Sequence, residues 1–268
     1  MSSYRNIIIP LAVKAGKEIL KYYKKKTNIS YKIDNSPLTE ADLAANRIII
    51  KGLENTKIPI ISEESENVTY EIRKLWKKFW IIDPLDGTKQ FVKNEDEFTV
   101  NIALIVNNKP VEGVVYAPAM DLLFYGNVID GAERIEVGMK MKSEKICYES
   151  SDLLRIVASK SHLNESTKEF LQRIENLIKK TSIVNIGSSL KFCLVASGKA
   201  DLYPRLGSIN EWDIAAGNAV LNAAGGFVIN MQTGKEVEYN SESLLTPDFI
   251  AFGDEKIISK TDILKLYK

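Results

Sequence analysis

The stretch from residue 79 to residue 126 constrains the fold of this chain more than any other. It contains an apolar run at residues 79–83 and then three more at 98–106, 111–117 and 122–126, which are separated by short turns at 107–108 and 118–121. In the second run apolar residues alternate with other residues, and this period of two predicts a strand with one buried face. Strands of this length joined by short turns predict an antiparallel meander.

Helices are expected before this meander. Apolar residues recur at helical spacing over about residues 4–24, which predicts an amphipathic helix. Thr39 is expected to cap a second helix that runs to about Leu53. Residues 57–62 then predict a short apolar strand.

Strands and helices alternate in the C-terminal part. We expect strands at 154–159, 182–186, 200–204, 226–230 and 248–252, and helices at 164–179, at 188–197 and from about Trp212 to Gly225. A polar stretch at 131–151 separates this part from the meander. The change of pattern predicts an N-terminal α+β half at 1–148, with most of the candidate metal ligands, and a C-terminal α/β half at 149–268.

The composition disfavours several classes of function. The chain has 268 residues with 36 Lys and Arg against 35 Asp and Glu, a net charge of +1, and no basic stripe with interspersed aromatics, so no nucleic-acid partner is expected. The chain has only two cysteines, so no disulfide framework is expected and a cytoplasmic location is favoured. No apolar run reaches the roughly 18 residues of a membrane span, although peripheral association with the inner membrane face stays open.

Acidic residues follow predicted strands or begin a predicted helix in three separate stretches. They are Glu63 and Glu64 after the strand at 57–62, Asp83 and Asp86 in the segment DPLDGT, and Asp213 in the segment EWD. Taken singly, the two glutamates fit a solvated loop and Asp213 fits a helix cap. Magnesium prefers several carboxylate oxygens, and such acids, without matching cations beside them, would repel one another unless a metal ion lay between them.

The segment DPLDGT, residues 83–88, is the most informative of the three. Pro84 is expected to end the strand pairing, and Gly87 permits a tight turn. Two carboxylates and the hydroxyl of Thr88 then emerge at the end of a strand, where open α/β sheets bind ligands. The carbonyl of Leu85 could add a metal ligand.

Other phosphatase chemistries fit the residues poorly. His162 is the single histidine, which disfavours a histidine phosphatase, and Cys193 lies in an apolar helical run typical of a core. The acids of DPLDGT are three residues apart, whereas haloacid-dehalogenase phosphatases require D-x-D-G-T. The chain also lacks the phosphate loop G-x-x-x-x-G-K-[ST].

Three of these segments resemble the inositol monophosphatase superfamily of lithium-sensitive, magnesium-dependent phosphatases. They are ISEES at 61–65, DPLDGTKQF at 83–91 and EWDIAAG at 211–217. The segment GSSLKFCLVASGKADLYPR at 187–205 is closer still to its 3'(2'),5'-bisphosphate nucleotidase branch, the CysQ type. The resemblance implies a layered α/β/α/β/α sugar-phosphatase fold, with the site between the two halves.

The resemblance also implies roles for individual residues. It implies magnesium ligands at Glu63, Asp83, the Leu85 carbonyl, Asp86 and Asp213. It implies phosphate binding by the same site, with contributions from Glu63, Leu85, Asp86, Gly87, Thr88 and Asp213. Thr88, assisted by Asp42 or Glu63, is expected to orient the attacking water and to help take its proton.

Further residues match the family with less constraint. Glu64 and Lys32 resemble family residues near the metal site, and Ser188, Lys191 and Arg205 are candidates for the nucleotide side. A capped helix with a solvated surface lysine is the alternative interpretation of the region from Ser188 to Lys191.

The activity implied is hydrolysis of adenosine 3',5'-bisphosphate to AMP and phosphate by water that magnesium activates, with 3'-phosphoadenylyl sulfate as a second substrate. We expect two or three Mg²⁺ ions, inhibition by Li⁺, and a monomer or homodimer. Two alternatives stay open. One is an inositol monophosphatase or a fructose 1,6-bisphosphatase of the same superfamily, and the other is a non-catalytic protein that binds metal or nucleotide.

Overall fold

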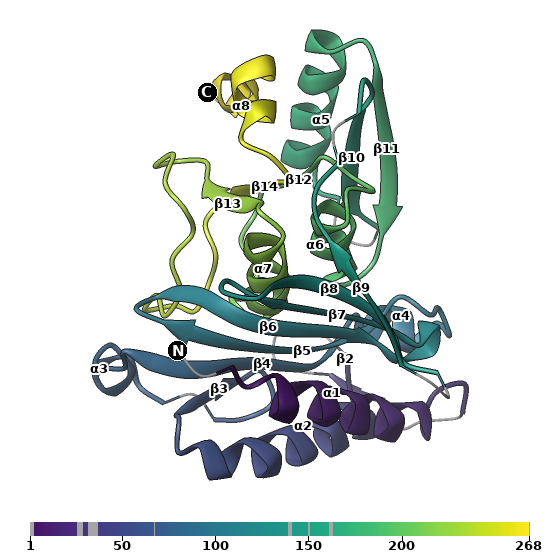
Figure 1. The fold of residues 1–268 in the computed structure, drawn as a ribbon, viewed down its shortest axis with the longest axis vertical. Coiled ribbons are helices and arrows are strands. Elements are labelled where there is room, and N and C mark those ends of the chain that lie inside the picture. The colour runs from purple at the N-terminus through teal and green to yellow at the C-terminus, as the bar shows by residue number, and fades with distance from the viewer. Residues whose placement is uncertain are drawn as a thin grey trace.

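The computed structural model describes residues 3–25, 29–31, 37–66, 68–138, 141–149, 151–160 and 163–267. Its helices and sheets form five layers (Figure 1). Helices α1 (Arg5–Leu20) and α2 (Glu40–Leu53) cover one face of a large sheet, and α6 (Leu190–Ala196) and α7 (Trp212–Ala223) separate it from a smaller sheet. Helices α5 (Glu165–Leu177) and α8 (Lys256–Thr261) lie beyond the smaller sheet. The expected α/β/α/β/α layering is confirmed.

The large sheet contains the predicted meander. Its described strands, in spatial order, are β3 (Ile60–Ser62), β4 (Lys78–Asp86), β5 (Thr99–Val106), β6 (Lys109–Ala117), β7 (Leu122–Asn127), β8 (Gly131–Glu136) and β9 (Lys142–Ile146). Strand β3 is parallel to β4, and the other neighbours are antiparallel. The last two strands were not predicted, because β9 is an exposed edge whose polar sequence has no buried face to reveal it.

The expectation of one buried face for β5 is wrong. Val100, Ile102 and Leu104 pack in the core beneath α1 and α2, while Ala103 and Ile105 pack in the core that contains α7. Helices cover both faces of the sheet, so every residue of β5 before Val106 is buried. The alternating apolar residues of the sequence indicated only the more apolar face of β5, the one that packs beneath α1 and α2.

Pro84 does not end β4. The pairing of β4 with β5 reaches Asp83 opposite Asn101, becomes irregular, and resumes with Asp86 opposite Thr99. A bulge absorbs the missing N–H of proline without ending the strand. Both aspartates of DPLDGT therefore lie on one strand rather than on a free turn.

The two N-terminal helices begin near the expected positions. Helix α1 is shorter than predicted and carries Pro10 inside it. Helix α2 begins after Thr39, whose hydroxyl accepts a hydrogen bond from the N–H of Ala41 at 3.2 Å. The side chain of Asp42 accepts from the N–H of Thr39 at 2.8 Å, and the Thr39 side chain accepts from the backbone of Asp42, so the two residues form a capping box. The predicted cap is confirmed.

The smaller sheet follows the predicted alternation. Its described strands, in spatial order, are β11 (Thr181–Ile186), β10 (Leu154–Ser159), β12 (Leu202–Arg205), β14 (Phe249–Phe252) and β13 (Phe227–Asn230). Strand β10 is parallel to both of its neighbours, and β14 is antiparallel to β12 and β13. The C-terminal helix α8 and the 3-10 turn η3 (Ile263–Tyr267) were not predicted.

Short elements complete the described chain. They are β1 (Ile29–Tyr31), β2 (Pro37–Thr39), η1 (Glu54–Thr56), α3 (Tyr70–Arg73), α4 (Thr88–Val92) and η2 (Pro118–Met120). Within the part of the chain that the structure describes, no helix is long and apolar enough to cross a membrane.

Helix α7 joins the two sheets into one structure. A Cβ added to Gly113 of β6 would lie 2.8 Å from the Cβ of Ala219, so the helix and the sheet are in direct contact. One continuous apolar core contains Phe79 of β4 together with Phe192 of α6 and Tyr203 of β12. The boundary between residues 148 and 149 stays a prediction.

Candidate active site

A pocket of about 590 Å³ lies where the large sheet meets the C-terminal part of the chain. The end of β4 and the start of α4 form one wall, with residues from Asp83 to Gln90. The lining residues from the C-terminal part include Gly187, Ser188, Ser189, Lys191, Phe192, Tyr203, Arg205, Ser208, Ile209, Asn210, Asp213, Ile214 and Leu245. A volume in this range suits a small molecule with several polar groups.

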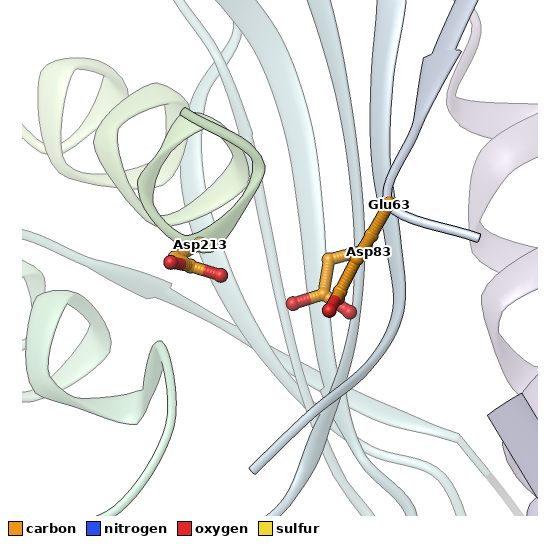
Figure 2. A group of neighbouring side chains, drawn as sticks. All are labelled: Glu63, Asp83 and Asp213. Atoms are coloured by element: carbon orange, nitrogen blue, oxygen red, sulfur yellow. The ribbon is translucent and has the colours of Figure 1, made fainter. Parts of the chain in front are cut away.

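Three acidic side chains converge in this pocket (Figure 2). Glu63 follows β3 and Asp83 lies in β4, and since these strands run parallel with Ser62 beside Ile82, their ends meet at one edge. Asp213 is the second residue of α7 and reaches the same place from the opposite side. One carboxylate oxygen from each lies within 4.8 Å of the others.

Asp83 is the most deeply buried of these acids, at 1% exposure. Its Oδ1 accepts a hydrogen bond from the N–H of Leu85 at 3.0 Å, whereas its Oδ2 is buried without a hydrogen-bond partner. Burial raises the pKa of Asp83 well above its ordinary value, and the charge of Glu63 raises it further. Burial, followed by the charge of Asp86, raises the pKa of Asp213 in the same way.

This donor set fits a hard divalent cation. Three carboxylates offer oxygens toward one point, and a buried carboxylate oxygen has no other partner there. A cation among them would offset the repulsion that raises the pKa values of Asp83 and Asp213. Magnesium is usually held by such carboxylates together with water and substrate oxygens.

Asp86 lines the same pocket but does not belong to the three-acid group. Its Oδ2 accepts a hydrogen bond from the backbone N–H of Ser189 at 2.5 Å. Burial raises the pKa of Asp86 to about 6, although the positive charge of Lys191 opposes this shift. Asp86 therefore connects the DPLDGT segment to the C-terminal part of the site.

The turn after Asp86 places Thr88 beside the acids. Gly87 has a φ of 90°, and a Cβ there would lie 2.9 Å from the carbonyl oxygen of Glu97. Because this left-handed conformation favours glycine, the tight turn predicted at Gly87 is confirmed. The Thr88 hydroxyl lies 3.3 Å from Oδ1 of Asp42 and 3.1 Å from the Leu85 carbonyl oxygen, and can donate to either. The contact expected between Thr88 and Asp42 is present.

The expectation that the acids lack nearby cations is wrong. Lys191 and Arg205, from α6 and β12, line the same pocket. Lys191 is buried, which lowers its pKa to about 8, and its ammonium donates to the carbonyl of Ser188. The interpretation as a solvated surface lysine is therefore wrong. The sequence hid this proximity because Lys191 is far from the acids along the chain.

The remaining predicted residues have different surroundings. Ser188 lines the pocket with a φ of 50°, in the left-handed region. Glu64 does not line the pocket, and its backbone carbonyl accepts a hydrogen bond from Asn46. Lys32 lies outside the described residues, as does His162. Cys193 is buried in the core, as expected.

Gln90 and Asn101 were missed by sequence reasoning. Gln90 lines the pocket two residues after Thr88, so its place in the segment DPLDGTKQF was a usable signal. The side chain of Asn101 is buried, and its Oδ1 accepts a hydrogen bond from the hydroxyl of Ser189 at 2.7 Å. A single asparagine in an apolar strand gave no signal of this kind.

Comparison with known proteins identifies the family of this chain. A model of the Inositol monophosphatase family matches residues 1–263. This chain belongs to the inositol monophosphatase family. The match spans both sheets and every described acid of the pocket, so the expected family is confirmed.

Individual members of the family are similar over most of their length. The 3'(2'),5'-bisphosphate nucleotidase CysQ of Buchnera aphidicola is 46% identical over 240 residues, which cover 88% of this chain and 87% of that protein. The enzyme of the same name from Escherichia coli K12 is 43% identical over 90% of this chain and 96% of its own. The crystal structure of CysQ from Bacteroides thetaiotaomicron has a TM-score of 0.82 and 40% identity, covering 91% of this chain and 95% of that one.

Proposed function

We propose that this chain is a magnesium-dependent 3'(2'),5'-bisphosphate nucleotidase. In this proposal it hydrolyses adenosine 3',5'-bisphosphate to AMP and phosphate, and 3'-phosphoadenylyl sulfate is a second substrate. The observation that carries the proposal is that one pocket is lined both by an acidic cluster and by two cationic side chains, Lys191 and Arg205. The similarity to CysQ nucleotidases supports the same substrate class.

The acidic residues of the pocket would hold the metal ions. The proposed ligands are the carboxylates of Glu63, Asp83, Asp86 and Asp213 together with the Leu85 carbonyl oxygen. Bound magnesium supplies positive charge that lowers the pKa of water and offsets the charge of the phosphoryl oxygens. Two or three ions, and inhibition by Li⁺, are part of the proposal.

Thr88 would orient the attacking water. A hydroxyl that donates to Asp42 keeps its oxygen lone pairs available for a hydrogen bond from a water in the pocket. Glu63, at the same pocket, is the second candidate to take the proton. A bond then forms between the water oxygen and phosphorus, the bond to the ribose oxygen breaks, and that oxygen takes a proton.

The cationic residues of the pocket would bind the second phosphate group. Lys191 and Arg205 line the pocket together with Ser188, and their charges are those that a phosphate attracts. Burial of Lys191 strengthens its attraction for an anion because little water screens it. A bisphosphate carries a second anionic group that these charges can attract, which favours a bisphosphate substrate.

Phosphate release from a panel of substrates tests the proposal. The panel contains adenosine 3',5'-bisphosphate, inositol 1-phosphate and fructose 1,6-bisphosphate, each with and without magnesium. We expect the nucleotide to have the highest kcat/KM and no turnover after chelation of the metal. Equal or faster hydrolysis of inositol 1-phosphate would contradict the nucleotide assignment, and no release from any substrate would indicate a non-catalytic protein.

Location and assembly belong to the proposal as well. A cytoplasmic location is consistent with the two cysteines, which form no disulfide with each other since Cys147 is exposed and Cys193 is buried. We propose a monomer or a homodimer, and sedimentation equilibrium of the purified protein distinguishes the two.

A further inference from the structure

Glu97 lies in the loop between α4 and β5 and contacts the turn formed by residues 187–189. Its Oε2 accepts a hydrogen bond from the backbone N–H of Gly187 at 2.8 Å. Its own backbone is equally close, because a Cβ added to Gly187 would lie 3.0 Å from the Glu97 carbonyl oxygen. Glu97 is not among the described residues that line the pocket, so it acts on this turn from behind.

The turn at 187–189 carries groups that the proposed function uses. The N–H of Ser189 donates to Asp86, and the carbonyl of Ser188 accepts from the ammonium of Lys191. Ser188 has a φ of 50°, a conformation that a serine adopts only when its surroundings hold it there. The position of Lys191 therefore depends on whatever fixes this turn.

Two sets of contacts fix the turn. The hydroxyl of Ser189 lies 2.8 Å from the Thr99 hydroxyl and donates to Asn101 at 2.7 Å, which ties the end of the turn to β5. The start of the turn is tied by the bond between Gly187 and Glu97. The strained residue Ser188 lies between these two attachments.

The carboxylate of Glu97 is itself held in place. Its Oε1 lies 3.4 Å from the ammonium of Lys160, which also pairs with Glu95 at 2.9 Å. The side chain of Glu97 is only 22% exposed, whereas that of Glu95 is 35% exposed and forms no hydrogen bond to the turn within the described part of the chain. The ammonium of Lys160 lies 3.4 Å from both carboxylate oxygens of Glu97, so it holds the carboxylate whose Oε2 accepts from Gly187.

We propose that Glu97 is a positioning residue for the second phosphate group of the substrate. The inference rests on the proposed function, in which Lys191 and Arg205 bind that group. By holding the N–H of Gly187, Glu97 fixes the backbone of Ser188 and, through its carbonyl, the ammonium of Lys191. Its loss weakens recognition of the second phosphate more than it weakens hydrolysis.

The test compares two substrates that differ only in that group. In Glu97→Ala we expect kcat/KM for adenosine 3',5'-bisphosphate to fall about tenfold, mostly through KM, because a hydrogen bond to a charged acceptor is lost. The value for adenosine 3'-monophosphate, which lacks the second phosphate, should change by less than about twofold. Equal losses for both substrates would indicate general disruption of the site and would overturn the proposal.

Two further variants make the test specific. Glu97→Gln keeps an oxygen that can accept from Gly187, so it should restore most of the preference for the bisphosphate. Glu97→Met removes the acceptor at similar volume and replaces the alanine variant if that variant does not fold. The hydrogen-bond role would be contradicted if Glu97→Gln failed to restore the preference for the bisphosphate. It would also be contradicted if Glu97→Met kept the selectivity of the wild type.

The control variant is Glu95→Ala, which removes a carboxylate that pairs with the same lysine. It should leave the ratio of the two kcat/KM values unchanged. A loss equal to that of Glu97→Ala would assign the effect to Lys160 and overturn the proposal.

If the wild-type protein releases no phosphate from the bisphosphate, the proposed function itself fails. An active wild type with unchanged selectivity in Glu97→Ala overturns only the role of Glu97.

Discussion

At the residue scale, Asp42 has a structural and a functional position at once. One oxygen of its carboxylate accepts from the backbone and hydroxyl of Thr39, and the other lies in hydrogen-bonding distance of Thr88. The capping box of α2 therefore holds the group that fixes the hydroxyl of Thr88. The cap and the site share one side chain because α2 begins beside the end of β4.

The role proposed for Thr88 predicts a specific kinetic effect. In Thr88→Ala, kcat should fall roughly 10²-fold while KM changes little, because the hydroxyl orients a proton transfer and contributes little to binding. Steady-state kinetics with adenosine 3',5'-bisphosphate measure both constants. Thr88→Ser keeps the hydroxyl and should retain most of the activity. A change confined to KM in the alanine variant would argue against a role in orienting water.

At the element scale, the position of α7 depends on two glycines of the large sheet. A Cβ at Gly113 would lie 2.9 Å from the carbonyl oxygen of Ala216, and one at Gly126 would lie 2.6 Å from Cα of Val220. The helix backbone lies directly on the sheet at these points. This close approach brings Asp213, at the start of α7, to the acids on β3 and β4.

Gly113→Ala should therefore affect both stability and metal binding. The added methyl group must push α7 away from β6, and overpacking of this kind costs about 1–3 kcal/mol in the free energy of unfolding. Urea denaturation measures this loss, and calorimetric titration should show weaker Mg²⁺ binding because Asp213 moves with α7. Gly138→Ala is the control, since among the described residues, its chain neighbours aside, no atom lies within 4 Å of a Cβ there. Equal stability of the two variants would contradict the packing argument.

At the scale of the whole molecule, the buried acids make stability depend on pH and metal together. Burial raises the pKa of Asp86 to about 6 from its ordinary value of 3.8, and it raises those of Asp83 and Asp213 in the same direction. Between pH 3.8 and about 6, Asp86 therefore keeps its proton in the folded protein more often than in the unfolded chain. The contribution of Asp86 to the stability of the metal-free protein is therefore present below 3.8 and is lost as the pH rises through about 6.

Magnesium should reverse this loss, since it binds the deprotonated carboxylates. We expect the increase in Tm on adding Mg²⁺ to be small near pH 5 and larger near pH 7, above the pKa of about 6 at which Asp86 loses its proton. Thermal unfolding with and without the ion measures this difference. Asp86→Asn should reduce it, and Glu165→Gln, at an exposed carboxylate on α5, should not. A metal effect that is equal at both pH values would contradict the linkage.

The sequence by itself determined most of the elements and the segments that carry the acidic groups of the pocket. Periodicity revealed the meander and the alternating C-terminal part, because a buried face leaves its period in the residues of one segment. The cap at Thr39 and the turn at Gly87 could be predicted for the same reason, since each depends on contacts only a few residues apart. Oxygen-rich segments at strand ends indicated a magnesium site before any contact was known.

Only the tertiary structure decided which distant groups meet. It brought Asp213 to Glu63, buried Lys191 beside Asp86, and joined Glu97 to Gly187. It also continued β4 past Pro84 and buried both faces of β5, because helices from elsewhere in the chain cover the sheet. Burial and charge at a residue depend on partners far away along the chain, and no local pattern records those partners.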